Sequence, residues 1–345
     1  MSIAFYGLNP VNTIDLLKER ARLLKEGRGW TDGRKVGLIV EGGAMRGVIS
    51  CAALMALEDL GLTDVFDEVY GASAGAVNAA YFLAGQAGYA TTIYYQKINN
   101  TRFIGRLWRR QVVNIDDLFD SVIAGDRPLR IDRVLASRSR FFITIADAVT
   151  GEAFLGLAQS NETPLLTLLK ASAAMPFFYN GIVTVNGRQC FDGALINPIP
   201  IPEAIDSGCT DLLVLLTRPA IFRECPPSRF EQHIFDLRCA RGNLKLLTAF
   251  CETHLRANAI RDMALGRQPP PDGVRIATIC PDETDPRIER LTRSTELLKA
   301  AAIASAKRTM EVFGHPVEQF VEVLRPYPSV KTERLVAAPD FLKSA

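Results

Sequence analysis

Short continuous apolar runs alternate along this chain with longer stretches in which apolar residues recur every three or four positions. The short runs are typical of buried strands, and the longer stretches are typical of amphipathic helices. Strands are predicted over residues 35–40, 69–72, 141–146, 153–157, 211–217 and 274–279. Helices are predicted over residues 14–24, 48–57, 76–83, 203–208, 244–263 and 294–312. This alternation predicts a three-layer α/β/α fold with a mainly parallel central sheet.

The same pattern divides the chain into three segments. These are 1–33, an N-terminal helical extension and linker; 34–217, a core; and 218–345, a lid-like loop followed by helices and one further strand, packed on the same domain. Asn12 or Thr13 is expected to cap the first helix. The stretch 218–229 contains Pro219, Pro226 and Pro227 and is expected to be irregular. It either overhangs a site as a lid or is a plain crossover loop.

A predicted strand runs directly into Gly71-Ala72-Ser73-Ala74-Gly75 and then into a predicted helix. This Gly-x-Ser-x-Gly pattern is typical of a nucleophile elbow, in which small residues let the chain turn sharply and expose one serine hydroxyl. Such a pentad arises by chance in roughly one chain in ten of this length. The pentad alone therefore leaves open a tight turn in which Ser73 merely caps the helix.

A second glycine-rich turn, residues 41–47, lies between the first predicted core strand and its helix. Glycines there leave backbone N–H groups unshielded at the positive end of the helix dipole, so an anion can bind. A dinucleotide site is disfavoured because Ala44 stands where the fingerprint needs glycine, and no P-loop lysine follows. An oxyanion hole for acyl transfer fits better.

A third motif, Asp192-Gly193, follows a hairpin predicted over residues 181–185 and 188–191 through Asn186-Gly187. Asp-Gly by itself is a common turn signal. Beside a candidate nucleophile and a candidate oxyanion loop, Asp192 becomes a candidate base.

Taken together over roughly residues 36–216, these three motifs resemble the patatin-like phospholipase family. The resemblance implies a patatin-like α/β fold and a lipid acyl hydrolase that cleaves ester bonds of phospholipids or lysophospholipids through an acyl-enzyme, with no cofactor or metal. The resemblance assigns these roles: Gly42, Gly43 and Ala44 as backbone donors of the oxyanion hole, Arg46 as the adjacent cation, Gly71 and Gly75 as the elbow glycines, Ser73 as nucleophile and Asp192 as its only catalytic partner.

Two residues depart from the family's usual pattern. Ala44 replaces a third glycine, which predicts that no backbone angle reserved for glycine is needed there. Glu41 replaces the commoner aspartate, and we expect it to affect support of the loop rather than chemistry. A Ser-Asp pair also needs burial, because an aspartate with its ordinary pKa near 3.9 is a weak base.

Two alternatives stay open. A Ser-Asp-His carboxylesterase would need one of the three histidines, of which His233 is the first to test; His254 is expected on a helix, facing solvent or capping it, and His315 near a helix C-terminus. A non-catalytic module could instead keep the glycine loop to bind an anion or a lipid.

Composition limits the partners and the compartment. The net charge of +2 gives no reason to expect a nucleic-acid partner, and the seven cysteines form no Cys-x-x-Cys pair or disulfide framework. No signal peptide or apolar run long enough to span a membrane is recognised, so a cytoplasmic protein is expected. A basic segment with Arg102, Arg106, Trp108, Arg109 and Arg110 could contact the inner membrane surface peripherally; the alternative is a surface helix whose apolar stripe packs in the core.

Overall fold

The computed structural model describes residues 5–6, 10–105, 112–160, 162–176, 178–179 and 181–315. Its strands are β1 Phe5–Tyr6, β2 Val36–Val40, β3 Glu68–Ala72, β4 Arg140–Asp147, β5 Ala153–Leu157, β6 Val183–Val185, β7 Arg188–Asp192, β8 Asp211–Leu215 and β9 Arg275–Ile279. Its α-helices are α1 Pro10–Lys25, α2 Gly47–Asp59, α3 Ala74–Leu83, α4 Ala87–Gln96, α5 Ile115–Asp117, α6 Ile131–Leu135, α7 Leu165–Ala173, α8 Ile201–Asp206, α9 Arg229–Phe235, α10 Leu244–Ala264 and α11 Thr295–Val312.

The strands form one sheet with the order β1-β9-β8-β2-β3-β4-β7-β6, and β5 pairs with β4 outside that path. The five neighbouring strands β9, β8, β2, β3 and β4 are parallel. Antiparallel pairing is confined to β1 at one edge and to β5, β6 and β7 at the other end. The predicted α/β fold with a mainly parallel central sheet is confirmed.

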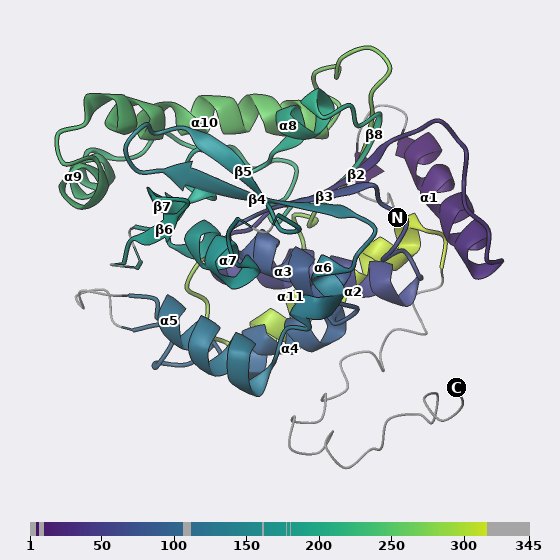
Figure 1. Cartoon of the computed structure of the whole chain (residues 1–345), viewed down its shortest axis with the longest axis horizontal. Helices are drawn as coiled ribbons and strands as arrows, with labels where there is room; N and C mark the ends of the chain where they lie inside the picture. The colour runs from purple at the N-terminus through teal and green to yellow at the C-terminus, as the bar shows by residue number, and fades with distance from the viewer. Residues whose placement is uncertain are drawn as a thin grey trace.

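Helices cover both faces of this sheet (Figure 1). On the face with α2, α3 and α11, one large apolar cluster includes Leu38 and Val40 of β2. On the face with α8 and α10, a second cluster includes Ile39 of the same strand. Because successive side chains of a strand point to opposite faces, β2 supplies both layers, which explains why its sequence is apolar throughout.

The first helix begins earlier than predicted. It starts at Pro10, so neither Asn12 nor Thr13 caps it. Proline is well suited to a first helical position, because its missing N–H would have no partner there. The hydroxyl of Thr13 instead donates to Asp211 Oδ1 at 3.3 Å.

The surface helix, which was the alternative interpretation of the basic segment, is not seen over residues 97–105. Helix α4 ends at Gln96, and Ile104 forms an isolated antiparallel bridge with Val113. Arg102 is exposed and pairs with Asp117. The other residues of this prediction, Arg106, Trp108, Arg109 and Arg110, lie outside the described residues.

The C-terminal segment is part of the same sheet and of both helical layers. It supplies β9 to the sheet, α10 to one face and α11 to the other. Residues 218–228 connect β8 to α9 without regular secondary structure, as predicted. Among the described residues, no helix is both long enough and apolar enough to cross a membrane.

Candidate active site

Ser73 lies at a sharp turn between β3 and α3. Its backbone angles, φ 56° and ψ −130°, are unfavourable for a residue with a side chain. The flanking glycines make the turn possible, because a Cβ at Gly71 would lie 2.5 Å from Ala76 Cα and one at Gly75 would lie 2.2 Å from Val40 O. The predicted strand–turn–helix geometry of a nucleophile elbow is therefore present, and the side chain of Ser73 does not cap α3.

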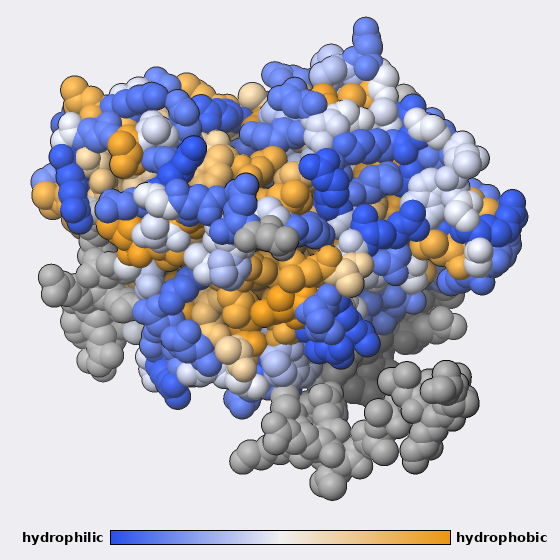
Figure 2. Space-filling model, viewed as in Figure 1, coloured by the Kyte–Doolittle hydropathy of each residue, from blue (hydrophilic) through white to orange (hydrophobic). Residues whose placement is uncertain are grey.

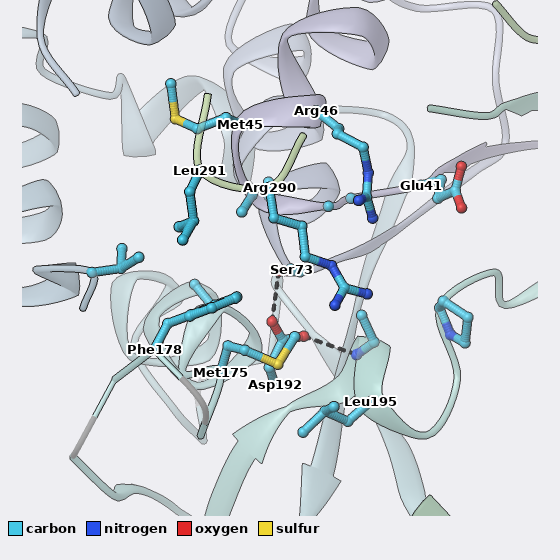
Figure 3. Close-up of a pocket in the computed structure, with 18 of the residues that line it drawn as sticks. Glu41, Met45, Arg46, Ser73, Met175, Phe178, Asp192, Leu195, Arg290 and Leu291 are labelled. Atoms are coloured by element: carbon cyan, nitrogen blue, oxygen red, sulfur yellow. Dashed lines mark hydrogen bonds between the residues drawn. The ribbon is translucent and has the colours of Figure 1, made fainter. Parts of the chain in front are cut away.

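The carboxylate of Asp192 accepts a short hydrogen bond from the Ser73 hydroxyl. Ser73 Oγ donates to Asp192 Oδ2 at 2.6 Å, and the N–H of Ala194 donates to Oδ1 at 2.8 Å (Figure 3). Asp192 ends β7, where it pairs with Ile145 of β4, and β4 in turn pairs with β3 just before Ser73. The sheet thus brings together two residues that are 119 positions apart.

Burial changes the basicity of Asp192. Its side chain has no exposed surface, and this desolvation raises its pKa from 3.8 to about 7 despite the hydrogen bonds from Ser73 and Ala194 and the charge of Arg290, which lower it. A carboxylate with a pKa near neutrality is a much better base than an ordinary aspartate.

The glycine loop faces the elbow. A Cβ at Gly42 would lie 2.3 Å from Ala72 O and 3.0 Å from the N of Ala74, so only glycine allows this approach. The N–H groups of Gly42, Gly43 and Ala44 donate to no residue that the structure describes. The arrangement leaves a row of unused donors beside Ser73.

One expectation about this loop is wrong. Ala44 has a φ of +53°, in the left-handed region that favours glycine, whereas its sequence predicted that no such angle was needed. The turn from Gly43, with φ +134°, into the 3₁₀ turn Ala44–Arg46 imposes this conformation. Alanine tolerates it at a cost of about 1–2 kcal/mol.

Residues far along the chain hold the glycine loop in place. Glu41 Oε2 accepts hydrogen bonds from the Thr217 backbone at 2.5 Å and from its hydroxyl at 3.1 Å. The Thr217 hydroxyl also donates to Gly42 O at 2.8 Å, and Arg261 lies 3.4 Å from Glu41 Oε1. Nothing in the sequence singled out Thr217 or Arg261, because neither belongs to a motif.

Ser172 is a further residue that the motifs did not reveal. Its hydroxyl accepts a hydrogen bond from the Ser73 backbone N at 2.9 Å and donates to Thr144 O at 2.7 Å. It therefore ties the elbow to β4 and α7. It belongs to none of the three sequence motifs.

Arg46 is buried beside the glycine loop, and two of its three guanidinium nitrogens have no partner among the described residues. Its side chain is 5% exposed, and Nε and Nη1 make no hydrogen bond to the described residues. Burial and, secondarily, the charges of Arg290 and Arg218 lower its pKa to about 9. In Figure 3, the guanidinium groups of Arg46 and Arg290 both extend into the pocket that contains Ser73 and Asp192.

These groups open onto a cavity of about 870 Å³. Apolar side chains form much of its wall, among them Val77, Tyr81, Ile93, Ile98, Phe103, Leu118, Phe178 and Leu291. The irregular stretch after β8 lines it too, through Phe222, Glu224 and Pro226. A large apolar cavity with a few convergent polar groups is typical of a site for an apolar ligand.

The three histidines occupy different places. His254 on α10 lines the cavity, although its sequence predicted a solvent-facing or capping position; its Nδ1 is 2.8 Å from Cys251 O. His233 lies on α9, a helix that the sequence pattern did not predict, and the N–H of His315 bonds to Met310 O after α11. Within the described part of the chain, Ser73 Oγ bonds to Asp192 and to no histidine, and no cluster of three metal-ligating side chains occurs.

Comparisons with known proteins show what this chain is similar to. Residues 38–205 match the model of the family described as patatin-like phospholipase. Residues 38–205 form a patatin-like phospholipase domain. The chain is also 28% identical over 256 residues to the uncharacterized protein YjjU of Escherichia coli (strain K12), covering 72% of this chain and 68% of that protein. The crystal structure of VipD from Legionella pneumophila is similar with a TM-score of 0.40 and 12% identity, over 81% of this chain and 66% of that chain.

The patatin-like domain supports lipid acyl hydrolase activity in broad terms, of the esterase or lipase type. All three sequence motifs fall within its matched residues. The supporting Thr217 and Arg261 and the cavity-lining Arg218 and Arg290 lie beyond them.

Proposed function

We propose that this protein hydrolyses carboxylic ester bonds of phospholipids or lysophospholipids through a Ser73–Asp192 dyad and an acyl-enzyme intermediate. The observation that carries the proposal is the 2.6 Å hydrogen bond from Ser73 Oγ to a fully buried carboxylate. The family match and the apolar cavity support a lipid substrate. The acyl chain would lie along the apolar wall.

In the first half of the reaction, Asp192 Oδ2 takes the hydroxyl proton while Ser73 Oγ attacks the ester carbonyl carbon. The carbonyl oxygen becomes an oxyanion that the N–H groups of Gly42, Gly43 and Ala44 stabilise, with Arg46 as the adjacent cation. The protonated Asp192 then gives its proton to the leaving alkoxide, and the acyl group stays on Ser73. One donor of this kind is worth about 2.7–4 kcal/mol of transition-state stabilisation in known hydrolases.

In the second half, water attacks the acyl-enzyme. Asp192 accepts a proton from that water, the same N–H groups stabilise the second oxyanion, and Ser73 leaves as the hydroxyl with the proton returned by Asp192. A single carboxyl group with a pKa of about 7 can both accept and release this proton near neutral pH.

Labelling with a fluorophosphonate probe tests the proposal directly. The wild-type protein should be labelled at Ser73, and Ser73→Ala should abolish the label. Ser121→Ala, at an exposed serine, should leave it intact. An unlabelled wild type would favour a non-catalytic binding module, and labelling that survives Ser73→Ala would contradict the proposed nucleophile.

His254 supports a second candidate mechanism, a Ser-Asp-His carboxylesterase. It lines the same cavity, and the bond of its Nδ1 to Cys251 O leaves Nε2 available. If the dyad is correct, Asp192→Asn lowers ester turnover by about 10²–10⁴-fold, and His254→Ala or His233→Ala retains it. Turnover that survives Asp192→Asn and is lost with either histidine would favour the triad.

We also propose a division of the chain into 1–33, an N-terminal helical extension and linker; 34–217, the catalytic core; and 218–345, a lid-like loop with C-terminal helices and one further strand, packed on the same domain. Peripheral contact of a cytoplasmic protein with an anionic membrane is proposed through the segment that begins at Arg102. Phe230, which lines the cavity and is 73% exposed, lies at the α9–α10 end, where Figure 2 shows apolar surface. Liposome sedimentation of Arg102→Gln and Phe230→Ser tests which of these two surfaces contributes to membrane binding.

A further inference from the structure

Four arginines line the catalytic cavity, and one of them, Arg223, pairs with Asp262 at 2.7 Å. The other three are Arg46 from the glycine loop, Arg218 from the stretch after β8 and Arg290 from the stretch before α11. Each is close enough to the others for mutual repulsion, since Arg290 lowers the pKa of both Arg46 and Arg218. Like charges gathered in one cavity cost free energy unless an anion joins them.

The arginines have donors to spare. Arg46 Nε and Nη1 and Arg218 Nε are buried without a hydrogen-bond partner among the described residues. The guanidinium carbon of Arg218 lies 4.2 Å from the centroid of the Phe222 ring, a contact that uses none of its N–H groups. Arg290 forms no ion pair with the residues that the structure describes, and its guanidinium extends toward Ser73 and Asp192 (Figure 3).

The acids that face the same cavity are mostly engaged elsewhere. Glu41 forms an ion pair with Arg261 and a hydrogen bond with Thr217. Glu289 forms an ion pair with Arg287 at 3.0 Å. Glu231 bonds to Ser228 in the cap of α9. Asp192 holds Ser73. Glu224 is the cavity acid whose carboxylate has no partner among the described residues, and its charge raises the pKa of Arg46 and Arg218.

We propose that Arg218 and Arg290, together with Arg46, bind the phosphate of the substrate head group. This inference rests on the proposed function and narrows it to esters that carry a phosphate near the scissile bond. Guanidinium groups suit this ligand, because their planar donors match phosphate oxygens in pairs. The backbone also couples this subsite to the reaction centre, since the Met45 N–H donates to Arg290 O at 3.3 Å.

Two esters that differ only in the phosphate test the proposal: 1-octanoylglycerol 3-phosphate and 1-octanoylglycerol. Octanoate release is measured on the high-pH plateau of each variant. Wild type should have a higher kcat/KM for the phosphorylated ester. Arg290→Gln or Arg218→Gln should reduce this preference about tenfold or more, mainly through KM, because each variant loses one charge-assisted hydrogen bond. Arg290→Lys should restore part of it.

Arg293→Gln is the matched control, because Arg293 lies three residues away, is exposed and does not line this cavity. It should leave the preference unchanged. Glu224→Gln should increase the preference, because it removes the competing carboxylate. An unchanged preference in both Arg218→Gln and Arg290→Gln would overturn the proposal.

A binding measurement separates this inference from the proposed reaction. Decyl phosphate should raise the melting temperature of wild type more than decanol does, and Arg290→Gln should reduce that difference. Equal stabilisation by inorganic phosphate alone would show a free-phosphate site and overturn the head-group assignment. If wild type hydrolyses neither ester yet decyl phosphate binds through Arg290, the proposed function fails while the phosphate subsite stands.

Discussion

The two sides of the Ser73 hydroxyl differ in how well their polar groups are satisfied. On the side of Asp192, both carboxylate oxygens accept hydrogen bonds, and Ser172 fixes the backbone of the nucleophile. On the side of the glycine loop, the backbone N–H groups donate to no described residue, and Arg46 is buried with unpaired nitrogens.

This difference indicates which side is complete before substrate binds. Buried donors and charges without partners destabilise a fold, so a protein keeps them only where something else supplies the acceptor. An oxyanion and a phosphate are both acceptors of the required charge. The satisfied side orients the resting nucleophile, and the unsatisfied side is complementary to negative charge that arrives with the substrate.

The largest expected effect is on the satisfied side. Asp192→Asn should lower kcat by about 10²–10⁴-fold, because it removes the base. It should also stabilise the protein above neutral pH, because burying the ionised carboxylate costs free energy that the amide does not. The gain at about pH 8 should be on the order of 1–4 kcal/mol in denaturant unfolding. A loss of both activity and stability would show that Asp192 is structural.

Removing a buried charge on the unsatisfied side should also lower activity, by a smaller factor, and should again raise stability. Arg46→Met removes a buried, unpaired cation and keeps much of the side-chain length. We expect kcat/KM to fall by about 10²–10³-fold and the unfolding free energy to rise by about 1 kcal/mol or more. If Arg46→Met unfolds more easily, Arg46 has a structural partner and the contrast between the two sides is wrong.

The pH dependence follows from the raised pKa of Asp192. Activity requires the ionised carboxylate, so kcat/KM should rise about tenfold per pH unit up to about pH 7 and then level off. Arg290→Gln should move this midpoint upward, because the charge of Arg290 lowers the Asp192 pKa. The contribution of Asp192 to the free energy of unfolding has the opposite pH dependence. It is complete below about pH 4, where the carboxyl is protonated in both states, and is lost as the pH rises through about 7. A flat profile from pH 5 to 9 would exclude Asp192 as the base.

The smallest expected effect concerns the backbone of the glycine loop. Ala44→Gly relieves a left-handed conformation and adds backbone freedom to the unfolded chain, so the two terms nearly cancel and stability should rise by less than about 1 kcal/mol. Activity should change less than about twofold. Ala136→Gly, at an exposed helix end with an ordinary φ of −84°, should only destabilise. Equal destabilisation in both variants would mean that Ala44 is not strained.

Local sequence patterns predicted the parts of this site that local chemistry determines. The elbow, the glycine loop and the hairpin before Asp192 each depend on short-range requirements for glycine, for apolar strands and for helix starts. The burial that raises the Asp192 pKa also follows from the chemistry of a Ser-Asp pair.

Other parts depend on contacts between distant segments and left no local signal. Thr217 and Arg261 support Glu41 across more than half the chain, and Arg290 reaches the cavity from the stretch before α11. The left-handed φ of Ala44 was missed because alanine, unlike glycine, is not a residue that indicates such an angle in a sequence. Helix α1 begins at Pro10, and the Thr13 hydroxyl bonds to Asp211, which is 198 positions away, instead of capping a helix end.

The pairing of Asp192 with Ile145 has a consequence for engineering and for natural variation. Side chains of a strand alternate between the two faces, so adding or deleting one residue between 188 and 192 would turn the carboxylate away from the serine while leaving the sheet intact. The tip at Gly187 has open space around it and could change length without that effect. A chain could thus lose all activity through an indel that alters no motif, and motif searches would still count it as an enzyme.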